Sequence, residues 1–424
     1  MVRIYALFII LCALFTNIAP VAAAETIELT LEQAITLALE KNPELSSSSW
    51  EIRAREGKVT QASTLPNPEL SFNMDNFGGN KDLRGFDGAE YTLALTQLIE
   101  LGGKRLKRAY AAGIERDLGK WDYEAKKLDL LNEVTKAFTD VIAEQERLKV
   151  SEELYKLAEQ SLNTVSARVQ AGKVSPIEEI KASAELSKSR IEFERAKRSL
   201  DAARKRLSTV MGSPTPVFEK AVGQLDLAAD IPSSDQLAQN INRNPDVARW
   251  VTEIEQRRAV MNLERANRLP DPSISIGVKR FRETETSAMV AGISFPLPIF
   301  NRNSGAVAEA ESRLSKAEQE QKTALLKAHS SLTEAYATLS SSFVEATALK
   351  TSILPGLQTA FDSIQEGYRY GKFSYLDLLD AQRSLSESKK QFIESLAAYR
   401  KAYADVERLT GRAAERYSNT TVTK

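Results

Sequence analysis

The stretch of this chain that comes closest to a functional site is YRYGKFSYLDLLDAQRSL, at residues 368–385. Gly371 interrupts a run of helix-forming residues there, and Asp377 and Asp380 follow it three positions apart. Residues three apart share one face of a helix, so the two carboxylates should point the same way. Such carboxylates can favour cations in a narrow pore, or Asp377 can simply stabilise the start of the following helix. The residues alone leave both interpretations open.

The sets of residues that catalysis needs are missing from the sequence. There is one histidine, His329, and it belongs to no Ser/His/Asp set, metalloprotease motif or phosphate loop. The one cysteine, Cys12, lies before the expected start of the mature chain. Without thiols, and with few methionines, a selective site for a soft metal is hard to build. We therefore expect no enzyme, no cofactor and no resident metal.

Composition favours long helices and argues against nucleic acid as a partner. Aromatic residues make up 7% of the 424 residues and charged residues 27%, a profile typical of long amphipathic helices. Lysine plus arginine and aspartate plus glutamate both number 57, so the formal net charge is zero. The chain has no basic field of the kind that binds nucleic acid.

The first residues have the pattern of an export signal. We expect a signal peptide at 1–24, with an apolar run at 4–15 and small residues at Ala22 and Ala24 before the cleavage point. Lipidation of Cys12 is an alternative, which the large residue before it disfavours. No later apolar run approaches the roughly 18 residues of a membrane-spanning helix. The mature protein is therefore exported and should cross no membrane as a helix.

Internal repeats divide the mature chain into two copies of one unit. KNPEL at 41–45 returns as RNPDV at 243–247, and LPNPELSF at 65–72 returns as LPDPSISI at 269–276. Gly172 matches Gly371 at an offset of 199 residues (371 − 172). The sequence thus predicts these segments: a first repeat at 25–212, a linker rich in proline and small residues at 213–234, a second repeat at 235–412 and a tail at 413–424.

Each repeat is predicted to contain a helix, two strands, a long helix, a turn and a further helix. The first helix should run from about 30 to 62. Apolar and polar residues then alternate in four segments, which predicts strands at about 68–76, 90–97, 272–280 and 287–296. Segments of about ten residues suit tilted transmembrane strands, although two surface hairpins on a soluble protein would show the same pattern.

Two arguments favour an assembly of several chains. Four strands cannot close a barrel, and an open sheet edge is not tolerated in lipid, whereas a trimer would supply about twelve strands. In addition, apolar residues recur at every seventh position from Val134 to Val169, as in a coiled coil. This stretch lies in a proline-free segment at about 103–170, which as a helix would reach on the order of 100 Å and must pack against its repeat mate or another chain.

The order and duplication of these motifs resemble the TolC family of outer-membrane efflux proteins. The resemblance covers residues 25–412 and rests on NPEL, LPNPELSF and the repeated turn at Gly172 and Gly371. The junction LTQLIELGGKRLKRAYAA, at 95–112, is most similar to the CzcC-like branch of heavy-metal cation efflux systems. For its basic cluster at 102–108, a solvated junction and contact with anionic lipid are both open interpretations.

The resemblance implies a fold, partners and a gate. The fold would be mainly helical: a long antiparallel coiled-coil barrel in the periplasm, joined to a β-barrel in the outer membrane that a homotrimer completes. The partners would be outer-membrane lipid, a periplasmic adaptor and an inner-membrane RND-type pump. In this family, a tyrosine three residues before the turn glycine and aspartates six and nine after it narrow the periplasmic tip. Here they correspond to Tyr368, Asp377 and Asp380, while the same count from Gly172 retains an acidic residue only at Glu178.

The sequence therefore predicts a passive outer-membrane exit duct, with heavy-metal cations as the favoured cargo. A duct for drugs or secreted peptides is a second interpretation, against which only the ELGGKR junction argues. A secreted helical coiled-coil scaffold without pore activity is a third. The scaffold would be soluble without detergent and would conduct no ions.

Overall fold

The computed structural model describes residues 28–227 and 231–411, and two compact units make up the chain. The expected signal peptide at 1–24, with Cys12, and the tail at 413–424 lie outside the described residues. Each unit takes residues from both sequence repeats. The compact units and the repeats therefore do not coincide, because the long helices run through both units.

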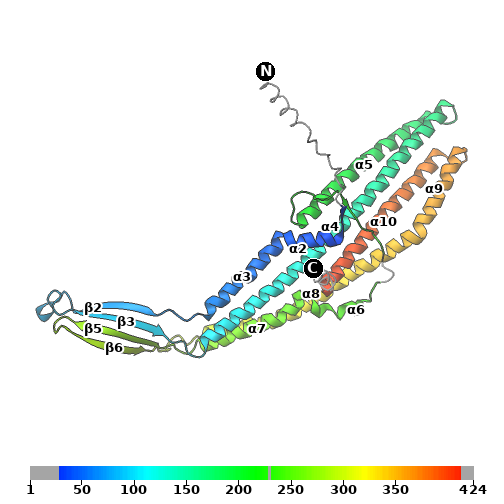
Figure 1. Ribbon diagram of the computed structural model, residues 1–424. Coiled ribbons are helices and arrows are strands. Elements are labelled where there is room, and N and C mark those ends of the chain that lie inside the picture. Colours follow the sequence, from blue (N-terminus) through cyan, green and yellow to red (C-terminus); the bar gives the residue numbers. More distant parts are fainter. Residues whose placement is uncertain (1–27, 228–230, 412–424) are drawn as a thin grey trace, which may run out of the picture. The chain divides into compact units, whose positions relative to one another are not determined.

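The first unit is built from two helical hairpins (Figure 1). One hairpin joins the later part of α4 (Lys104–Gln170) to α5 (Pro176–Val210), and the other joins α9 (Leu354–Arg369) to the first part of α10 (Tyr375–Thr410). The unit also holds β1 (Glu28–Leu29), α2 (Leu31–Lys41), β4 (Lys220–Ala221) and the π-helical segment η3 (Leu349–Ile353). β1 pairs in parallel with β4, and the Gln145 side chain bonds both the N–H and the carbonyl of Ala221 at 2.9 Å. The inter-repeat linker is thereby tied to α4.

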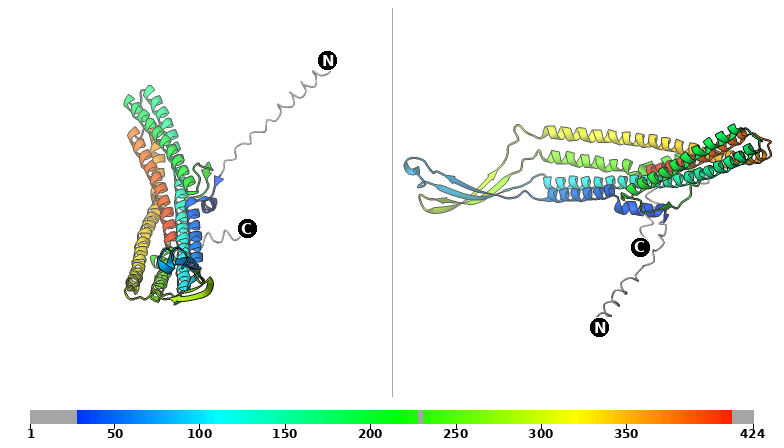
Figure 2. Two further views of the ribbon diagram at one scale, coloured as in Figure 1. Left: turned by 90° about the vertical axis from the view of Figure 1, so that its left-hand side faces the viewer. Right: turned by 90° about the horizontal axis from the view of Figure 1, so that it is seen from above.

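The second unit combines helices with the one sheet of four strands in the described chain (Figure 2). Its helical elements, besides the first part of α4 and the last part of α10, are α3 (Pro43–Ser63), η1 (Lys81–Leu83), α6 (Ser234–Ala238), η2 (Ile241–Arg243), α7 (Pro245–Ala266) and most of α8 (Ser304–Ala348). Its strands are β2 (Glu69–Asp75), β3 (Glu90–Leu98), β5 (Ser273–Phe281) and β6 (Thr286–Ser294). These bounds lie within two residues of the predicted ranges.

The sheet is antiparallel throughout, in the order β2-β3-β5-β6, so β2 and β6 each leave one edge unpaired within this chain. Directly paired residues share one face. What we call the apolar face holds exposed Leu70, Phe72, Leu93, Leu95, Ile274, Ile276, Val278, Met289 and Ile293. The opposite, polar face holds Glu69, Ser71, Asn73, Asp75, Glu90, Thr92, Thr96, Ser275 and Lys279, together with small residues and the apolar Phe281.

The repeated Asn-Pro pairs are helix starts. The side chain of Asn42 accepts hydrogen bonds from the backbone N–H groups of Glu44 (2.9 Å) and Leu45 (3.2 Å), and Pro43 begins α3. Asn244 caps α7 in the same way, and Pro245 follows it. The prediction of a single first helix at about 30–62 is therefore wrong. Because Pro43 has no N–H and Asn42 is extended, the chain breaks there into α2 and α3.

The two hairpin turns have the same backbone geometry. Gly172 and Gly371 adopt positive φ angles of 67° and 77°. The N–H of each glycine bonds a carbonyl three residues back, and that of the next lysine bonds one five residues back. This is the Schellman arrangement, which ends a helix on a left-handed residue and favours glycine.

Apolar residues at every seventh position of α4, together with apolar residues at intermediate positions, lie on its packed face. Leu131, Val134, Phe138, Val141 and Val165 are buried, and Leu148, Tyr155, Leu162 and Val169 are half-buried. The second repeat is less regular at the corresponding place, where η3 precedes Pro355. A proline ring clashes with the carbonyl four residues back, which accounts for the widened turn.

We expect Gly371→Ala to destabilise the protein and Gly356→Ala not to. An alanine at the left-handed Gly371 costs about 1 kcal/mol, whereas Gly356 is helical with open space around it, so alanine should gain up to about 1 kcal/mol there. Thermal unfolding followed by circular dichroism in detergent measures both effects. Equal midpoints for the two variants would contradict the assigned turn geometry.

Candidate gate at the tips of the helical hairpins

The two hairpin tips pack together in one apolar cluster of the first unit. α4 contributes Val165 to it, α5 contributes Ala182, and the second hairpin contributes Phe361, Tyr368, Tyr375, Leu378, Leu379 and Leu385. Residues that the duplicated sequence places 199 positions apart thus meet at one end of the unit. This cluster fixes the helices on which the predicted gate residues lie.

Asp377 and Asp380 are both exposed, at the start of α10. Oδ2 of Asp377 accepts hydrogen bonds from the backbone N–H of Ser374 (2.8 Å) and from its hydroxyl (2.7 Å). These bonds lower the pKa of Asp377 below its usual value. The backbone N–H of Asp377 donates in return to Oγ of Ser374 (3.2 Å). Ser374 and Asp377 therefore form a reciprocal capping pair at the start of α10. Asp377 stays charged and accessible, so the two interpretations of this residue are compatible.

Tyr368 is buried, with 3% of its surface exposed, and does not share the exposed face of the aspartates. The guanidinium of Arg168 lies 4.5 Å from the centre of the Tyr368 ring, and Nη1 of Arg168 donates to the carbonyl oxygen of Tyr368 at 2.6 Å. The ring of Tyr375 packs against it, 6.1 Å away between centroids. Burial raises the pKa of Tyr368, and raises that of Tyr375 to about 12, so both phenols are neutral at physiological pH.

Glu178, the acidic residue predicted for the first tip, is turned inward. It is half-buried, and its Oε2 atom is covered without a hydrogen-bond partner in the described chain. Its charge contributes to raising the pKa of both Tyr368 and Tyr375, after the larger effect of burial. The first repeat therefore adds no exposed carboxylate at this position, and the accessible acidic pair comes from the second repeat.

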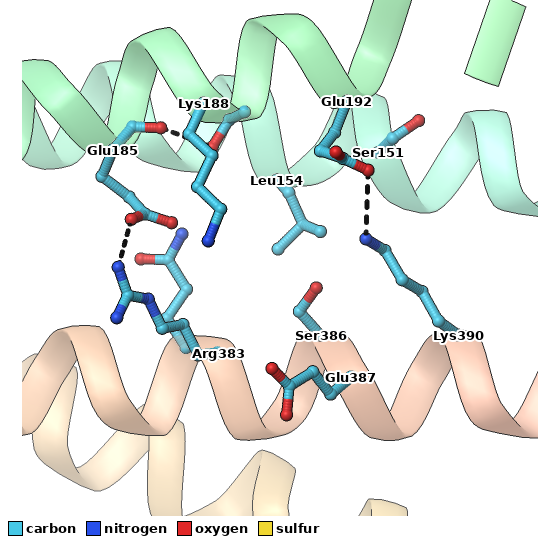
Figure 3. A pocket seen from close by; sticks show the side chains of 11 residues that line it. Ser151, Leu154, Glu185, Lys188, Glu192, Arg383, Ser386, Glu387 and Lys390 are labelled. Carbon is cyan, nitrogen blue, oxygen red and sulfur yellow. Dashed lines mark hydrogen bonds and ion pairs between the residues drawn. The ribbon is translucent and has the colours of Figure 1, made fainter. Parts of the chain in front are cut away.

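A polar seam continues from the tip between α5 and α10 (Figure 3). It encloses a cavity of about 100 Å³, crossed by ion pairs between Arg383 and Glu185 (2.6 Å) and between Lys390 and Glu192 (3.8 Å). Sequence reasoning missed this seam, and missed Arg168 beside the tip. The seven-residue pattern marks the buried faces of the helices, but it does not identify which charged residues at their edges will meet.

Two of the four cations in the basic cluster at 102–108, Lys104 and Arg108, make internal contacts within the second unit. Nζ of Lys104 lies 2.7 Å from a carboxylate oxygen of Asp271 and donates to the carbonyl of Leu269 at 2.6 Å. Arg108 donates to both carboxylate oxygens of Glu100. These two cations are therefore neither a solvated junction nor a lipid contact, because they join the strand ends to the helices.

Two further findings concern membranes and metals. Within residues 28–227 and 231–411, no helix combines the length and the apolar character needed to cross a bilayer. Over the same residues, no three histidine, cysteine, aspartate or glutamate side chains gather closely enough to hold a metal ion.

We expect Tyr368→Phe to leave stability unchanged or raise it, and Arg168→Ala to lower it. The Tyr368 hydroxyl is buried without a partner in the described chain, so its removal relieves a desolvation cost. Arg168→Ala removes a charged hydrogen bond and a cation–π contact, worth together about 2 kcal/mol. Thermal unfolding of both variants measures this, and a loss on Tyr368→Phe as large as that on Arg168→Ala would refute the assignment.

Known proteins resemble this chain in sequence. Residues 34–213 and 237–412 match the family described as outer membrane efflux protein. The cobalt-zinc-cadmium resistance protein CzcC of Cupriavidus metallidurans is 34% identical over 398 residues, which cover 94% of each chain. The nickel-cobalt-cadmium resistance protein NccC of Alcaligenes xylosoxydans xylosoxydans is 25% identical, over 73% of this chain and 69% of that protein.

Solved structures share the fold. A membrane protein from Pseudomonas aeruginosa aligns with a TM-score of 0.77 at 20% identity, covering 91% of both chains. The CmeC outer membrane channel of Campylobacter jejuni aligns with a TM-score of 0.76 at 19% identity, covering 92% of this chain and 88% of that one. These likenesses confirm the predicted fold class, mainly helical with a β part, as in TolC-like channels.

The predicted resemblance is therefore correct at the level of the family. The protein is a transport channel rather than an enzyme, located in the outer membrane with its helical part in the periplasm. The chain belongs to the outer membrane efflux protein family.

Proposed function

We propose that this protein is the exit duct of a tripartite efflux system for heavy-metal cations. The choice of heavy-metal cations as cargo rests on the 34% identity to a cobalt-zinc-cadmium resistance protein over 94% of both chains. In this proposal a periplasmic adaptor links the duct to an inner-membrane RND-type pump. The pump supplies the energy and selects the metal, and the duct conducts passively.

The proposed assembly is a homotrimer, for which the sheet supplies the argument. β2 and β6 have unpaired edges in the chain described, and the apolar face is exposed across all four strands. Unpaired backbone groups are costly in lipid, so the edges need partners from other copies. Three copies supply about twelve strands, within the range of outer-membrane barrels, with the apolar face toward outer-membrane lipid.

The proposed periplasmic gate is a ring of carboxylates from Asp377 and Asp380, backed by the buried Tyr368. Both carboxylates are exposed on one face of α10, and threefold symmetry would gather three such pairs around the axis. A ring of like charge at a narrow opening favours cations and repels anions. Its self-repulsion also opposes closure, so contact with an adaptor can shift the equilibrium toward an open tip.

The cargo is tested by complementation. We expect this protein to restore growth on cobalt, zinc and cadmium to cells whose cobalt-zinc-cadmium pump and adaptor lack their own outer-membrane component. Growth inhibition by each metal is measured beside a matched drug-efflux strain that lacks its duct. Rescue of the drug strain alone would replace the metal cargo by drugs, and a water-soluble product that restores neither strain would favour the scaffold.

The gate is tested by single-channel recording in planar bilayers. Asp377→Asn with Asp380→Asn should reduce the preference for cations, because the ring loses its charge. The matched control is Glu219→Gln, which removes an exposed carboxylate from the inter-repeat linker. An unchanged reversal potential in the double variant, or an equal change in the control, would exclude the carboxylate ring as the selective element.

A further inference from the structure

We propose that Lys279 sets the ion preference of the strand part of this channel by occupying the place beside Glu90 that a permeating cation would otherwise take. This inference rests on the proposed function, because it requires the polar face of the sheet to line a water-filled pore. It is separate from the gate, since the residues concerned lie on β2, β3 and β5 rather than at the hairpin tips.

The register of the sheet gives the two cations of β5 opposite orientations. Lys279 pairs with Thr92 and lies on the polar face, whereas Arg280 pairs with Tyr91 and lies on the apolar face. The two residues are neighbours in sequence, carry the same charge and differ in the face they occupy. Arg280 is therefore a matched control for Lys279.

Acidic residues of the strands are all on the polar face. Asp75 pairs directly with Glu90, and Glu69 pairs with Thr96. Within the four described strands, Lys279 is the one basic residue on this face, so three carboxylates face one ammonium group. The polar face of each chain thus keeps two uncompensated negative charges.

Lys279 is held in place by two contacts. Its ammonium forms an ion pair with a carboxylate oxygen of Glu90, and it lies 5.5 Å from the centre of the Phe281 ring. The side chains of Lys279 and Glu90 are 26% and 22% exposed, so the pair is less screened than one on an open surface. Without Lys279, Glu90 would stand opposite Asp75 with no counter-charge, which is unfavourable for two like charges.

The consequence concerns how tightly cations are held. Two neighbouring carboxylates are the oxygen ligands that divalent cations favour, and a duct must bind its cargo weakly enough to release it. The ammonium of Lys279 neutralises one of them. Lys279 therefore keeps the acidic polar face attractive to cations and prevents it from retaining them.

The test compares three variants of the full-length protein in planar bilayers, each on the Asp377→Asn/Asp380→Asn background so that the tip does not set the preference. In a KCl gradient, Lys279→Gln should shift the reversal potential toward stronger cation preference, and Glu90→Gln should shift it the other way. Arg280→Gln should leave it unchanged. The shifts should be large near about 0.1 M salt and shrink near about 1 M, where the screening length falls from about 10 Å to about 3 Å.

A second readout uses zinc ions alone as the probe. Zinc should reduce the current through Lys279→Gln channels at concentrations that leave Arg280→Gln channels open. The exchange Glu90→Lys with Lys279→Glu keeps the ion pair and the net charge, so it should retain the parent's reversal potential even if a single variant assembles poorly.

The possible results separate this inference from the proposed function on which it rests. Channels that form normally but respond equally to Lys279→Gln and Arg280→Gln would overturn the role of Lys279 and leave the duct intact. A parent protein that forms no channel would overturn both.

Discussion

Backbone hydrogen bonding is the constraint on which the structure of this protein depends. The four strands pair one another's backbone N–H and C=O groups except along the outer edges of β2 and β6, and their apolar face is exposed. In an outer membrane those edges cannot face lipid, so a single chain is an incomplete unit. The proposed trimer, the pore and the ring of carboxylates all follow from the need to complete the sheet.

The helical part is built from two copies of one arrangement. In both copies a left-handed glycine reverses the chain, and an asparagine before a proline starts the helix that precedes the strands. The copies differ where function is proposed. The second repeat has the exposed Asp377 and Asp380 and the π-helical segment at Leu349–Ile353, whereas in the first repeat α4 is uninterrupted and Glu178 is turned inward. The two copies thus share the architecture and differ in which acidic residues are exposed.

Sequence reasoning succeeded where the determinant is local. The alternation of apolar and polar residues predicted the strands, the glycines marked the turns, and the seven-residue spacing identified the buried face of α4. Each of these patterns involves residues that are close together in the sequence. It failed where the determinant lies elsewhere in the chain. Arg168, which contacts the ring of Tyr368, and Asp271, which pairs with Lys104, both lie far from their partners in the sequence. The break at Asn42 and Pro43 was a local signal that could have been read, since the same pair was recognised as a repeat but not as a helix start.

The most direct test of this account is the number of chains in the protein extracted from the outer membrane, measured by native mass spectrometry in detergent. The account predicts a stable species of three copies, because the sheet edges of one chain can be satisfied only by other chains. A stable single chain that remains folded in detergent would contradict it, since the unpaired edges of β2 and β6 would then need no partner.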